Sequence, residues 1–436
     1  MISPTTTLVV CLAVLSLMPS LAQPQNGDTL RLSTLQEGTL ERDPRSGEIG
    51  LLATQSQLRL RNLAAERLPA LSVVGQAQYQ SDVARIPITL PGGMSPPVPP
   101  NDTYDARVEV QQRIIDPVAR ARRALENAEL AASQARVHTA LYGSRQAVND
   151  AFFAALQAQA QIGEIQTTIT DLEAQLGVAQ SRVREGSALP SEQNAIRAEL
   201  LRRRQTRDEL GAIRRASLAV LASFVGRALD SSSVLELPDY SGLVANARDS
   251  IAALRRRAEY EEFARTRDVL SRREDARGAQ DRPRLSAFGR AGYGRPGLNP
   301  LSDQFDTYWL AGVQLQWAPW TWGTTRRDRQ VIALERQIVA AEEAAFTERV
   351  GRAVTQDSET IDRLEAALAT DDEIVALRER IAAESRARFR EGAVTAAEFV
   401  DRQTDVLSAR LARALHRAEL AQARARFLTT LGIEVR

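Results

Sequence analysis

Cysteine, histidine and lysine are nearly or wholly absent from this sequence. Its 436 residues include one cysteine and two histidines, and all 56 basic residues are arginine. The histidines, His138 and His416, have no second ligand at metal-binding spacing, so no metal site is expected. The lack of lysine excludes a P-loop lysine and Schiff-base chemistry. Because no nucleophile–base constellation or phosphate-binding glycine loop is present either, we expect neither an enzyme nor a cofactor.

Charge and hydropathy exclude two further classes of protein. The formal net charge is +1, which leaves no basic footprint for binding nucleic acid. Beyond the N-terminus, no stretch approaches the roughly 18 apolar residues of a membrane-spanning helix. If the chain crosses a membrane, we therefore expect it to do so as a barrel.

The N-terminus has the pattern of an export signal. A short apolar run, Leu8–Met18, is followed by small residues that allow cleavage after Ala22. We predict a signal peptide over residues 1–22, although its first residues carry no arginine. Val10 is not the small residue that lipid attachment at Cys11 requires. The mature chain is then expected to contain no cysteine, no disulfide and no lipid anchor.

The sequence repeats itself at a distance of about 210 residues. Leu68–Gly75 returns as Arg282–Gly289, and Arg184–Gly186 returns as Arg390–Gly392. Each half is predicted to contain two strands, a very long helix, a glycine turn and a shorter return helix. A wall built by repetition of this kind typically surrounds a passage.

The repeat also sets the predicted organisation of the chain. Gly226 and Gly432 occupy the same place at the end of each return helix. We predict a first repeat over 23–226, an inter-repeat linker over 227–246 and a second repeat over 247–436. The two halves are expected to form one interwoven unit rather than separate domains.

Four short segments alternate apolar and mostly polar residues with a period of two, which predicts half-buried strands. Two of them begin after Pro69 and at Tyr104, and the other two begin at Leu285 and Trp309. The residues of the first segment on its apolar face are Leu71, Val73, Gly75, Ala77 and Tyr79. The corresponding residues of the last segment are Trp309, Ala311, Val313, Leu315 and Trp317.

All four tryptophans lie at or beside the last of these segments. Trp309 and Trp317 share its apolar face and are separated by about 26 Å along a strand, or nearer 20 Å once it is tilted. Together with Trp320 and Trp322 they are expected to form a membrane girdle. The alternative is a soluble sandwich with a tryptophan core. Two features argue against a soluble sandwich: only four short strands are predicted, and no apolar helix is available to cover them.

Two long segments without proline predict long helices. Residues 118–185 correspond to a rod of about 100 Å, and residues 327–391 form a second rod of similar length. A glycine ends each rod, and Thr395–Glu398 resembles a capping box that opens a return helix. Segments 30–67 and 247–281 are expected to fill the length that the shorter return helices leave. A heptad seam, which predicts coiled-coil packing, is formed by Ile162, Ile165, Ile169, Leu172, Leu176, Ala179 and Val183.

At this point several motifs match a known family. They are Leu68–Leu71, Gln314–Trp320, Arg388–Gly392, Glu398–Asp401 and Leu431-Gly432. Each motif is weak alone, but their order, duplication and spacing are jointly specific. Over nearly all of its mature length, the chain resembles the TolC-like outer-membrane efflux factors.

The resemblance implies a mainly α fold with a β-barrel portion, built from two structural repeats and closed as a trimer. Each chain would give four transmembrane strands to an outer-membrane barrel and its coiled-coil helices to a periplasmic tunnel. The implied partners are a periplasmic adaptor (membrane-fusion) protein, an inner-membrane pump reached through it, and outer-membrane lipid. Strand counting independently supports oligomerisation, because four strands leave open edges and eight strands enclose only side chains.

The resemblance also implies where the adaptor docks, namely at the glycine turns between the long helices and the return helices. Some family members have valine before the glycine, whereas this chain has glutamate in both halves, so the identity of its adaptor stays open. The alternative is that these glycines only end helices. The implied docking residues are Arg184, Glu185, Gly186, Ser187, Arg390, Glu391, Gly392 and Ala393.

Three acidic residues match positions that the family places around the aperture. Glu192, Glu398 and Asp401 would supply three carboxylates per chain, hence nine in a trimer. Such a ring favours cations and repels anions. Ala195 stands at the first-half position equivalent to Asp401, so the first half carries less charge. The alternative is ordinary solvated helix surface.

These expectations combine into one functional prediction. The chain is predicted to be a passive exit duct of a tripartite efflux pump, located in the outer membrane and periplasm and exporting small molecules such as drugs or other toxic compounds. Without an energy-coupling site, the driving force must come from a pump in another membrane. Two alternatives stay open: the outer-membrane component of a type I protein secretion system, and an exported coiled-coil scaffold that does not conduct.

Overall fold

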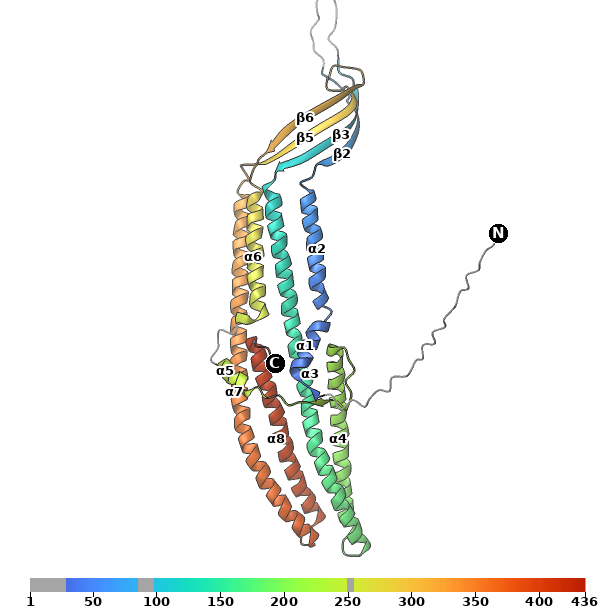
Figure 1. The fold of residues 1–436 in the computed structure, drawn as a ribbon, viewed down its shortest axis with the longest axis vertical. Helices are drawn as coiled ribbons and strands as arrows, with labels where there is room; N and C mark the ends of the chain where they lie inside the picture. Colours follow the sequence, from blue (N-terminus) through green and yellow to red (C-terminus); the bar gives the residue numbers. More distant parts are fainter. Residues whose placement is uncertain (1–28, 85–97, 249–254, 436) are drawn as a thin grey trace, which may run out of the picture.

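A computed structural model describes residues 29–84, 98–248 and 255–435, and it has the shape of a long rod of helices with a sheet at one end (Figure 1). The predicted signal peptide, with Cys11, lies outside the described residues. The elements of the first half are β1 (Thr29–Leu30), α1 (Leu32–Arg42), α2 (Ser46–Ala65), β2 (Ala70–Tyr79), β3 (Asp102–Ile115), α3 (Pro117–Arg184) and α4 (Pro190–Val225). Those of the second half are β4 (Val234–Leu235), α5 (Ser241–Arg248), α6 (Ala258–Ala279), β5 (Arg284–Arg295), β6 (Asp306–Gln316), α7 (Thr324–Arg390) and α8 (Ala396–Leu431).

The long helices form as their sequences predict. α3 has 68 residues and α7 has 67, so each spans about 100 Å. Asp116 caps α3 through its side chain, which accepts hydrogen bonds from the backbone N–H groups of Val118 and Ala119. Thr395 caps α8 by accepting from the backbone N–H of Glu398, as the predicted capping box requires. No helix in the described part of the chain is both long and apolar enough to cross a membrane.

Two pairs of shorter helices continue each other along the rod. α6 and α8 lie between α7 and α3, α6 near the sheet and α8 away from it, while α2 and α4 line the other side of α3 (Figure 1). The α2 and α6 helices, which lie within the predicted segments 30–67 and 247–281, therefore fill the length that the return helices leave. The heptad seam of α3 is buried at Ile165, Ile169 and Leu172 against the α4 and α8 helices.

The junctions between stacked helices repeat with the sequence. α4 ends at Gly226 and α8 ends at Gly432, both in the left-handed conformation. The Arg42 side chain donates to the Gly226 carbonyl oxygen (Nη1–O 2.8 Å), and that of Arg257 donates to the Thr430 carbonyl oxygen (2.7 Å). Arg42 is the last residue of α1 and Arg257 is the N-cap of α6, so each arginine satisfies a carbonyl at the end of one helix from the segment that leads into the helix stacked on it.

We predict that Gly432→Ala destabilises the protein more than Gly186→Ala does. Both glycines have a positive φ, which costs about 1–2 kcal/mol for alanine. A Cβ on Gly186 meets no atom within 4 Å, whereas one on Gly432 lies 2.9 Å from Arg257 Cγ and 3.3 Å from its backbone nitrogen. Overpacking there adds about 1–3 kcal/mol. Thermal unfolding of the two variants measures the difference, and equal losses would contradict the prediction.

A bend separates α1 from α2 and is fixed to α3. The Asp43 carboxylate accepts from the Arg45 guanidinium (Nη2–Oδ2 2.6 Å) and from the Ser144 hydroxyl (3.2 Å). Arg45 also donates to Ser144 Oγ (2.9 Å), so three side chains form one closed network. The Arg45 guanidinium lowers the pKa of Asp43 from 3.8 to about 2.

This network predicts a specific sensitivity to acid. The folded-state pKa of Asp43 lies below its unfolded value, so its stabilisation is complete above pH 4 and is lost as the pH falls from about 4 to about 2. We expect Asp43→Asn to cost about 1–2 kcal/mol at pH 7 and only about 0.4 kcal/mol or less at pH 2, where half of the folded-state carboxylates are protonated. Unfolding temperatures of both proteins across this range test it. A difference between them that does not change with pH would contradict the assignment.

The sheet joins the two repeats. Its strand order is β2-β3-β5-β6 and every pair is antiparallel, so β3 of the first repeat pairs with β5 of the second. β2 and β6 are the edges, and within the described chain neither has a partner on its outer side. A typical cross-strand row is formed by Val73, Val108, Ala291 and Trp309.

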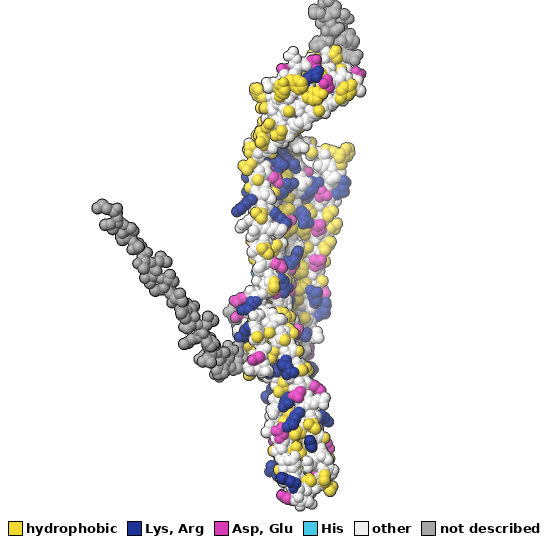
Figure 2. Space-filling model, turned by 90° about the vertical axis from the view of Figure 1, so that its right-hand side faces the viewer, with side chains coloured by type: hydrophobic (Ala, Val, Ile, Leu, Met, Phe, Trp, Pro, Cys, Tyr) yellow, Lys and Arg dark blue, Asp and Glu magenta, His cyan; other side chains and the backbone are white. Residues whose placement is uncertain are grey.

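One face of the sheet is apolar and uncovered. Val73 is 79% exposed, Trp309 76% and Val313 69%, values far above those of a packed strand. No helix in the described part of the chain covers this face (Figures 1 and 2). The soluble-sandwich alternative is wrong for this chain, because the tryptophans lie on the surface instead of in a core.

The apolar core lies away from the sheet, at two levels of the rod. The larger cluster surrounds Phe152 and Phe153 of α3 and includes Leu30 of β1 and Leu235 of β4. β1 pairs in parallel with β4, and Gln159 of α3 binds both backbone groups of Leu235. The predicted linker 227–246 is thus tied to the start of the described chain at mid-rod. The second cluster lies near the far tip of the helices.

Candidate functional site

The two turns at the tip of the rod have the same backbone geometry. Gly186 and Gly392 have φ values of +74° and +75°. In the first turn the backbone N–H of Gly186 donates to the carbonyl of Val183 (3.1 Å), and that of Ser187 donates to Arg182 (2.9 Å). The second turn repeats both bonds with the same spacing and lengths. This is the Schellman motif, which requires a residue that tolerates positive φ at the glycine.

The predicted docking residues all lie at these turns. The backbones of both turns reverse at the lower end of the rod (Figure 1). Leu189, at the N-terminus of α4, is 65% exposed at the same end, which sequence analysis did not single out. All eight predicted docking residues are exposed: Arg184, Glu185, Gly186, Ser187, Arg390, Glu391, Gly392 and Ala393.

A cation and two aromatic rings connect the two turns. Arg182 of α3 donates to the Phe389 carbonyl oxygen of α7 (Nη1–O 3.0 Å) and lies 5.7 Å from the centre of its ring. Phe389 stacks on Phe399 of α8, with ring centroids 5.0 Å apart, and both rings are buried. Arg386 of α7 pairs with Asp171 of α3 (2.7 Å) across the same region. The second turn is therefore held against α3 by polar and aromatic contacts.

The three predicted gate carboxylates lie in the first turns of the return helices. Glu192 is half-buried at the start of α4, while Glu398 and Asp401 are exposed at the start of α8. Among the described residues, none of the three forms an ion pair. A single chain does not bring Glu192 into contact with the other two.

The sheet carries an ion-pair network on the face opposite the apolar one. Arg107 pairs with Asp105 and with Glu109 (Nε–Oε1 2.6 Å). Arg290 pairs with the same Glu109 oxygen (3.2 Å), and the Tyr308 hydroxyl donates to Asp105 (2.5 Å). The predicted division into an apolar and a polar face is confirmed, and ion pairs connect neighbouring residues and strands on the polar face.

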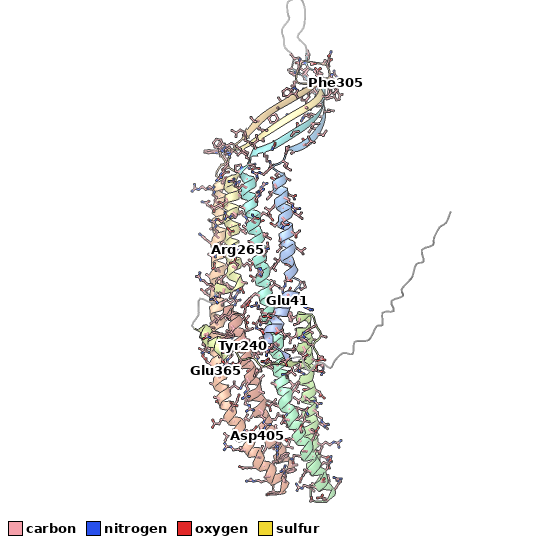
Figure 3. All side chains as sticks on the ribbon, in the orientation of Figure 1. Glu41, Tyr240, Arg265, Phe305, Glu365 and Asp405 are labelled. Carbon is pink, nitrogen blue, oxygen red and sulfur yellow. The ribbon has the colours of Figure 1, made fainter. Side chains whose placement is uncertain are left out.

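Aromatic side chains gather at both ends of the sheet. Phe305 stands at its upper end (Figure 3), 5.4 Å from the Tyr293 ring and 6.1 Å from the Tyr104 ring. Trp320 and Trp322 lie beyond the lower end of β6, with ring centroids 5.9 Å apart. This upper aromatic group was not predicted from the sequence, because Phe305 precedes β6 and so falls outside the alternating segments.

The four predicted girdle tryptophans are all exposed but do not share one level. Trp317 is 58% exposed and donates from Nε1 to the Asp281 carbonyl oxygen (3.0 Å), beside the start of α7. Trp309 lies eight residues earlier along β6, toward the upper group. Three tryptophans thus mark the lower end of the apolar face, and only Trp309 lies nearer its upper end.

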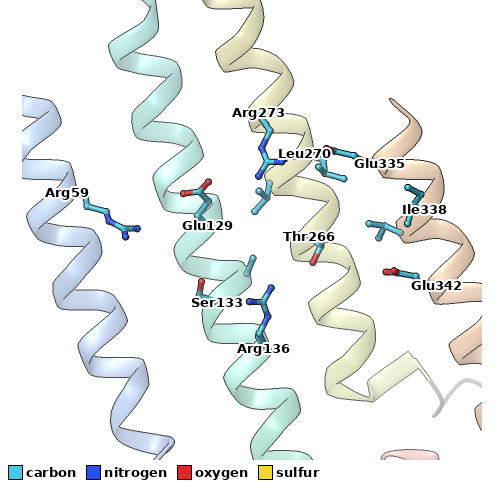
Figure 4. Close-up of a pocket in the computed structure, with 13 residues that line it drawn as sticks. Arg59, Glu129, Ser133, Arg136, Thr266, Leu270, Arg273, Glu335, Ile338 and Glu342 are labelled. Carbon is cyan, nitrogen blue, oxygen red and sulfur yellow. Dashed lines mark ion pairs between the residues drawn. The ribbon is translucent and has the colours of Figure 1, made fainter. Parts of the chain in front are cut away.

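A cavity of about 490 Å³ lies between α2, α3, α6 and α7 (Figure 4). Its charged lining is mixed: arginines and glutamates alternate around it, as in Arg273 and Glu335, which lie 3.6 Å apart. Mixed charge of this kind suits a solvated wall better than a site for one ligand. In the described residues, no group of three metal-ligating side chains is close enough to hold an ion, and His416 Nδ1 instead contacts Asp371 (2.6 Å).

Comparison with known proteins finds solved structures that share this fold. No protein-family model and no curated protein matches the sequence. Among solved structures, the outer membrane protein VceC of Vibrio cholerae matches with a TM-score of 0.65 at 15% identity, over 93% of this chain and 97% of VceC. CusC, described for its transmembrane channel formation, matches with a TM-score of 0.67 at 14% identity, over 95% of this chain and 96% of CusC.

A third structure shows a channel in its open state. The MtrE outer membrane channel of Neisseria gonorrhoeae matches with a TM-score of 0.65 at 17% identity, over 93% of this chain and 90% of MtrE. The chain has the fold of these outer-membrane channels. The predicted fold, long coiled-coil helices with four strands in two repeats, is therefore confirmed.

Proposed function

We propose that this chain is the outer-membrane component of an efflux pump: a trimer whose strands cross the outer membrane and whose helices form a periplasmic tunnel. The observation that carries the proposal is the sheet. Its apolar face is uncovered, its other face is charged, and its two edge strands are unpaired within the described chain. An apolar outer face and a polar inner face are what a membrane barrel with an aqueous interior requires.

Closure of the sheet follows from strand direction. The four strands alternate in direction, so the β2 edge of one chain can pair antiparallel with the β6 edge of the next. Open edges in lipid cost several kcal/mol for each unsatisfied backbone group, which strongly favours closure. Two chains give eight strands and an interior filled by side chains, whereas three give twelve and leave room for a conduit.

The helical wall supports the same assembly. α7 lies at one side of the wall, and α2 and α4 lie at the other (Figure 1). Both sides expose large apolar side chains that no described helix of the same chain covers. On α7 these are Val331, Leu334, Ile338, Ile374, Leu377 and Ile381, and on α2 and α4 they are Leu51, Leu58, Leu201, Ile213 and Val220.

The tip turns are proposed to receive the periplasmic adaptor. Two turns with identical backbone geometry give a trimer six similar docking positions, and their charged and apolar side chains are exposed. The duct is passive, so an inner-membrane pump, reached through the adaptor, supplies the energy. We propose small molecules such as drugs or other toxic compounds as its cargo.

Conductance and mass test the proposal directly. The full-length protein, extracted from outer membranes in mild detergent, is expected to run as a trimer in native mass spectrometry and to open ohmic pores in planar lipid bilayers. A monomer or dimer that never conducts would support the scaffold alternative instead. Pull-down of its adaptor, followed by identification of the pump, distinguishes small-molecule efflux from type I protein secretion.

The proposed gate makes a further prediction. In a trimer, Glu192, Glu398 and Asp401 come close to one axis and select for cations. We expect the double variant Glu398→Gln, Asp401→Asn to lower the cation-to-anion permeability ratio several-fold, as measured by reversal potentials under a salt gradient. The matched control is Glu384→Gln with Asp372→Asn on α7. Unchanged selectivity in the double variant would remove the gate role.

A further inference from the structure

Three arginines from three different elements line one cavity directly below the sheet. The cavity has a volume of about 600 Å³ and is bounded by the starts of α3 and α7 and the end of α6. Arg120 comes from the first turns of α3, Arg329 from those of α7, and Arg282 from the segment between α6 and β5. All three are exposed, and none of their guanidinium groups forms an ion pair or hydrogen bond with any residue that the structure describes.

The carboxylates near these arginines are engaged elsewhere. Glu274 lines the same cavity but pairs with Arg336 of α7 (2.7 Å). Asp275 also lines it and lies 3.6 Å from Arg272 of its own helix. The cavity therefore presents three guanidinium groups whose charge is not neutralised by a direct partner among the described residues, which favours an anion.

The position of Arg329 depends on a glycine. Its guanidinium lies across α6 at Gly278, where a Cβ would be only 2.6 Å from Nη2 of the arginine. Any larger residue at 278 forces the guanidinium to shift from this position. The cavity thus has a defined geometry in addition to its charge.

The cavity opens on the same side of the wall as the apolar face of the sheet. On the polar face, Arg113 pairs with Glu66, and Arg122 of α3 approaches the same carboxylate (3.7 Å). Arg120 precedes Arg122 by two residues, which on an α-helix is a rotation of about 200°. Arg120 therefore points away from the polar side.

Trp317 gives independent support for this placement. It directly follows β6, whose last residue is Gln316, and it donates to the carbonyl oxygen of Asp281. Asp281 lines a second cavity together with Arg326 and Arg329. Arg329 is thus shared by two cavities that adjoin the lipid-facing side of the sheet.

The depth of the cavity matches the phosphate layer of a bilayer. The lowest apolar row of the sheet is Ile115, Leu285 and Leu315, paired across three strands. Arg120 follows Ile115 by two extended and three helical steps, at most about 11 Å along the chain, and its side chain leans back toward the sheet, while Arg282 precedes Leu285 by three residues. Headgroup regions extend about 5–7 Å beyond the hydrocarbon edge. Basic side chains are visible at this level, as they are farther down the helices (Figure 2).

We propose that this cavity binds the phosphate of an anionic membrane lipid in the periplasmic leaflet, one site per chain. The proposal rests on the proposed location in the outer membrane. Arginine binds phosphate through paired N–H groups, and the exposed indoles beside the cavity suit the interface. A bound headgroup would connect the sheet to α3, α6 and α7 at the point where the wall changes from strands to helices.

Intrinsic fluorescence tests the proposal, because all four tryptophans lie at or beside β6. The detergent-purified full-length protein is reconstituted with brominated phosphatidylglycerol or brominated phosphatidylcholine, which quench indoles on contact. We expect relative binding constants to favour phosphatidylglycerol by about tenfold. The triple variant Arg120→Gln, Arg282→Gln, Arg329→Gln should lose this preference. The control Arg197→Gln, Arg215→Gln, Arg380→Gln removes the same charge far from the sheet and should keep it.

Two further measurements sharpen the outcome. Gly278→Ala removes no charge but displaces Arg329, and we expect it to weaken the preference about threefold. If only the triple variant has an effect, the lipid preference comes from many basic side chains around the sheet and not from the defined cavity, which contradicts the proposed site. If the triple variant behaves like the native protein, or if millimolar inorganic phosphate abolishes the preference, the lipid site is wrong.

The failure of this site is distinguishable from failure of the proposed function. Conductance in bilayers of phosphatidylcholine alone tests insertion and pore formation without an anionic lipid. A protein that conducts there but shows no lipid preference contradicts the lipid site only. A protein that neither inserts nor conducts contradicts the duct itself.

Discussion

Val313→Arg is expected to abolish assembly into the membrane. Val313 lies on the uncovered apolar face of β6 and is 69% exposed, so the proposed trimer presents it to lipid. An arginine on the lipid face of a barrel costs about 2–4 kcal/mol at the midplane and less toward the interfaces, and Val313 lies one row above Leu315 of the lowest apolar row. Three copies act together, so a cost of about 1–2 kcal/mol each gives a total of roughly 3–6 kcal/mol, a large part of the stability of a domain. The amount of heat-modifiable trimer in outer-membrane extracts measures the effect.

The matched control is the next residue along the strand. Gln314→Arg adds the same side chain to the same strand but on the polar face, where Gln314 pairs opposite Ser286. We expect this variant to assemble normally and to change only conductance or ion selectivity. Equal loss of trimer in both variants would show that the two faces are equivalent to the membrane, and would contradict the assignment of an outer face.

Phe399→Ala is expected to loosen the tip of the α7–α8 hairpin. Its side chain is fully buried and stacks on Phe389 at an interplanar angle of 16°. Truncating a buried phenylalanine costs about 3–5 kcal/mol, part of it from the cavity that remains. Arg182 contacts the ring of Phe389, the other member of this stack. The hydrogen bond from Arg182 to the Phe389 carbonyl oxygen should therefore weaken as well.

Hydrogen exchange of the tip tests this expectation. Amides at the end of α7 and the start of α8 should exchange about 100-fold faster or more in Phe399→Ala, following the lost stability. Phe399→Leu keeps most of the volume and should show a much smaller change. If the proposed docking is correct, adaptor binding falls with the loss of order. Unchanged protection would show that the stack does not hold the turn.

Several features of the fold could be predicted from local pattern alone. Alternation along β6 separates Val313 from Gln314, and the spacing of Ile165, Ile169 and Leu172 indicates a buried seam. Gly186 fits the left-handed end of a long helix, because few other residues tolerate that backbone conformation. These features depend on residues within one or two turns, so periodicity reports them directly.

The contacts that define the candidate sites did not follow from pattern. Arg182 and Phe389 are 207 residues apart, and nothing in their local sequence indicates that one binds the other's carbonyl. The upper aromatic group was missed because Phe305 reaches Tyr104 and Tyr293 across two strands and a loop. Contacts of this kind depend on how distant elements pack, which is a property of the whole chain.

By itself, the sequence determined which elements exist, where they end and which of their faces are apolar. These properties follow from side-chain periodicity and from the conformational limits of proline and glycine. Only the tertiary structure decided that β3 pairs with β5 across the repeat, that Arg257 stands at the end of α8, and that Arg120 and Arg329 line one cavity. Those choices depend on the balance of burial and hydrogen bonding over the folded molecule, because each brings together groups that the chain itself keeps far apart.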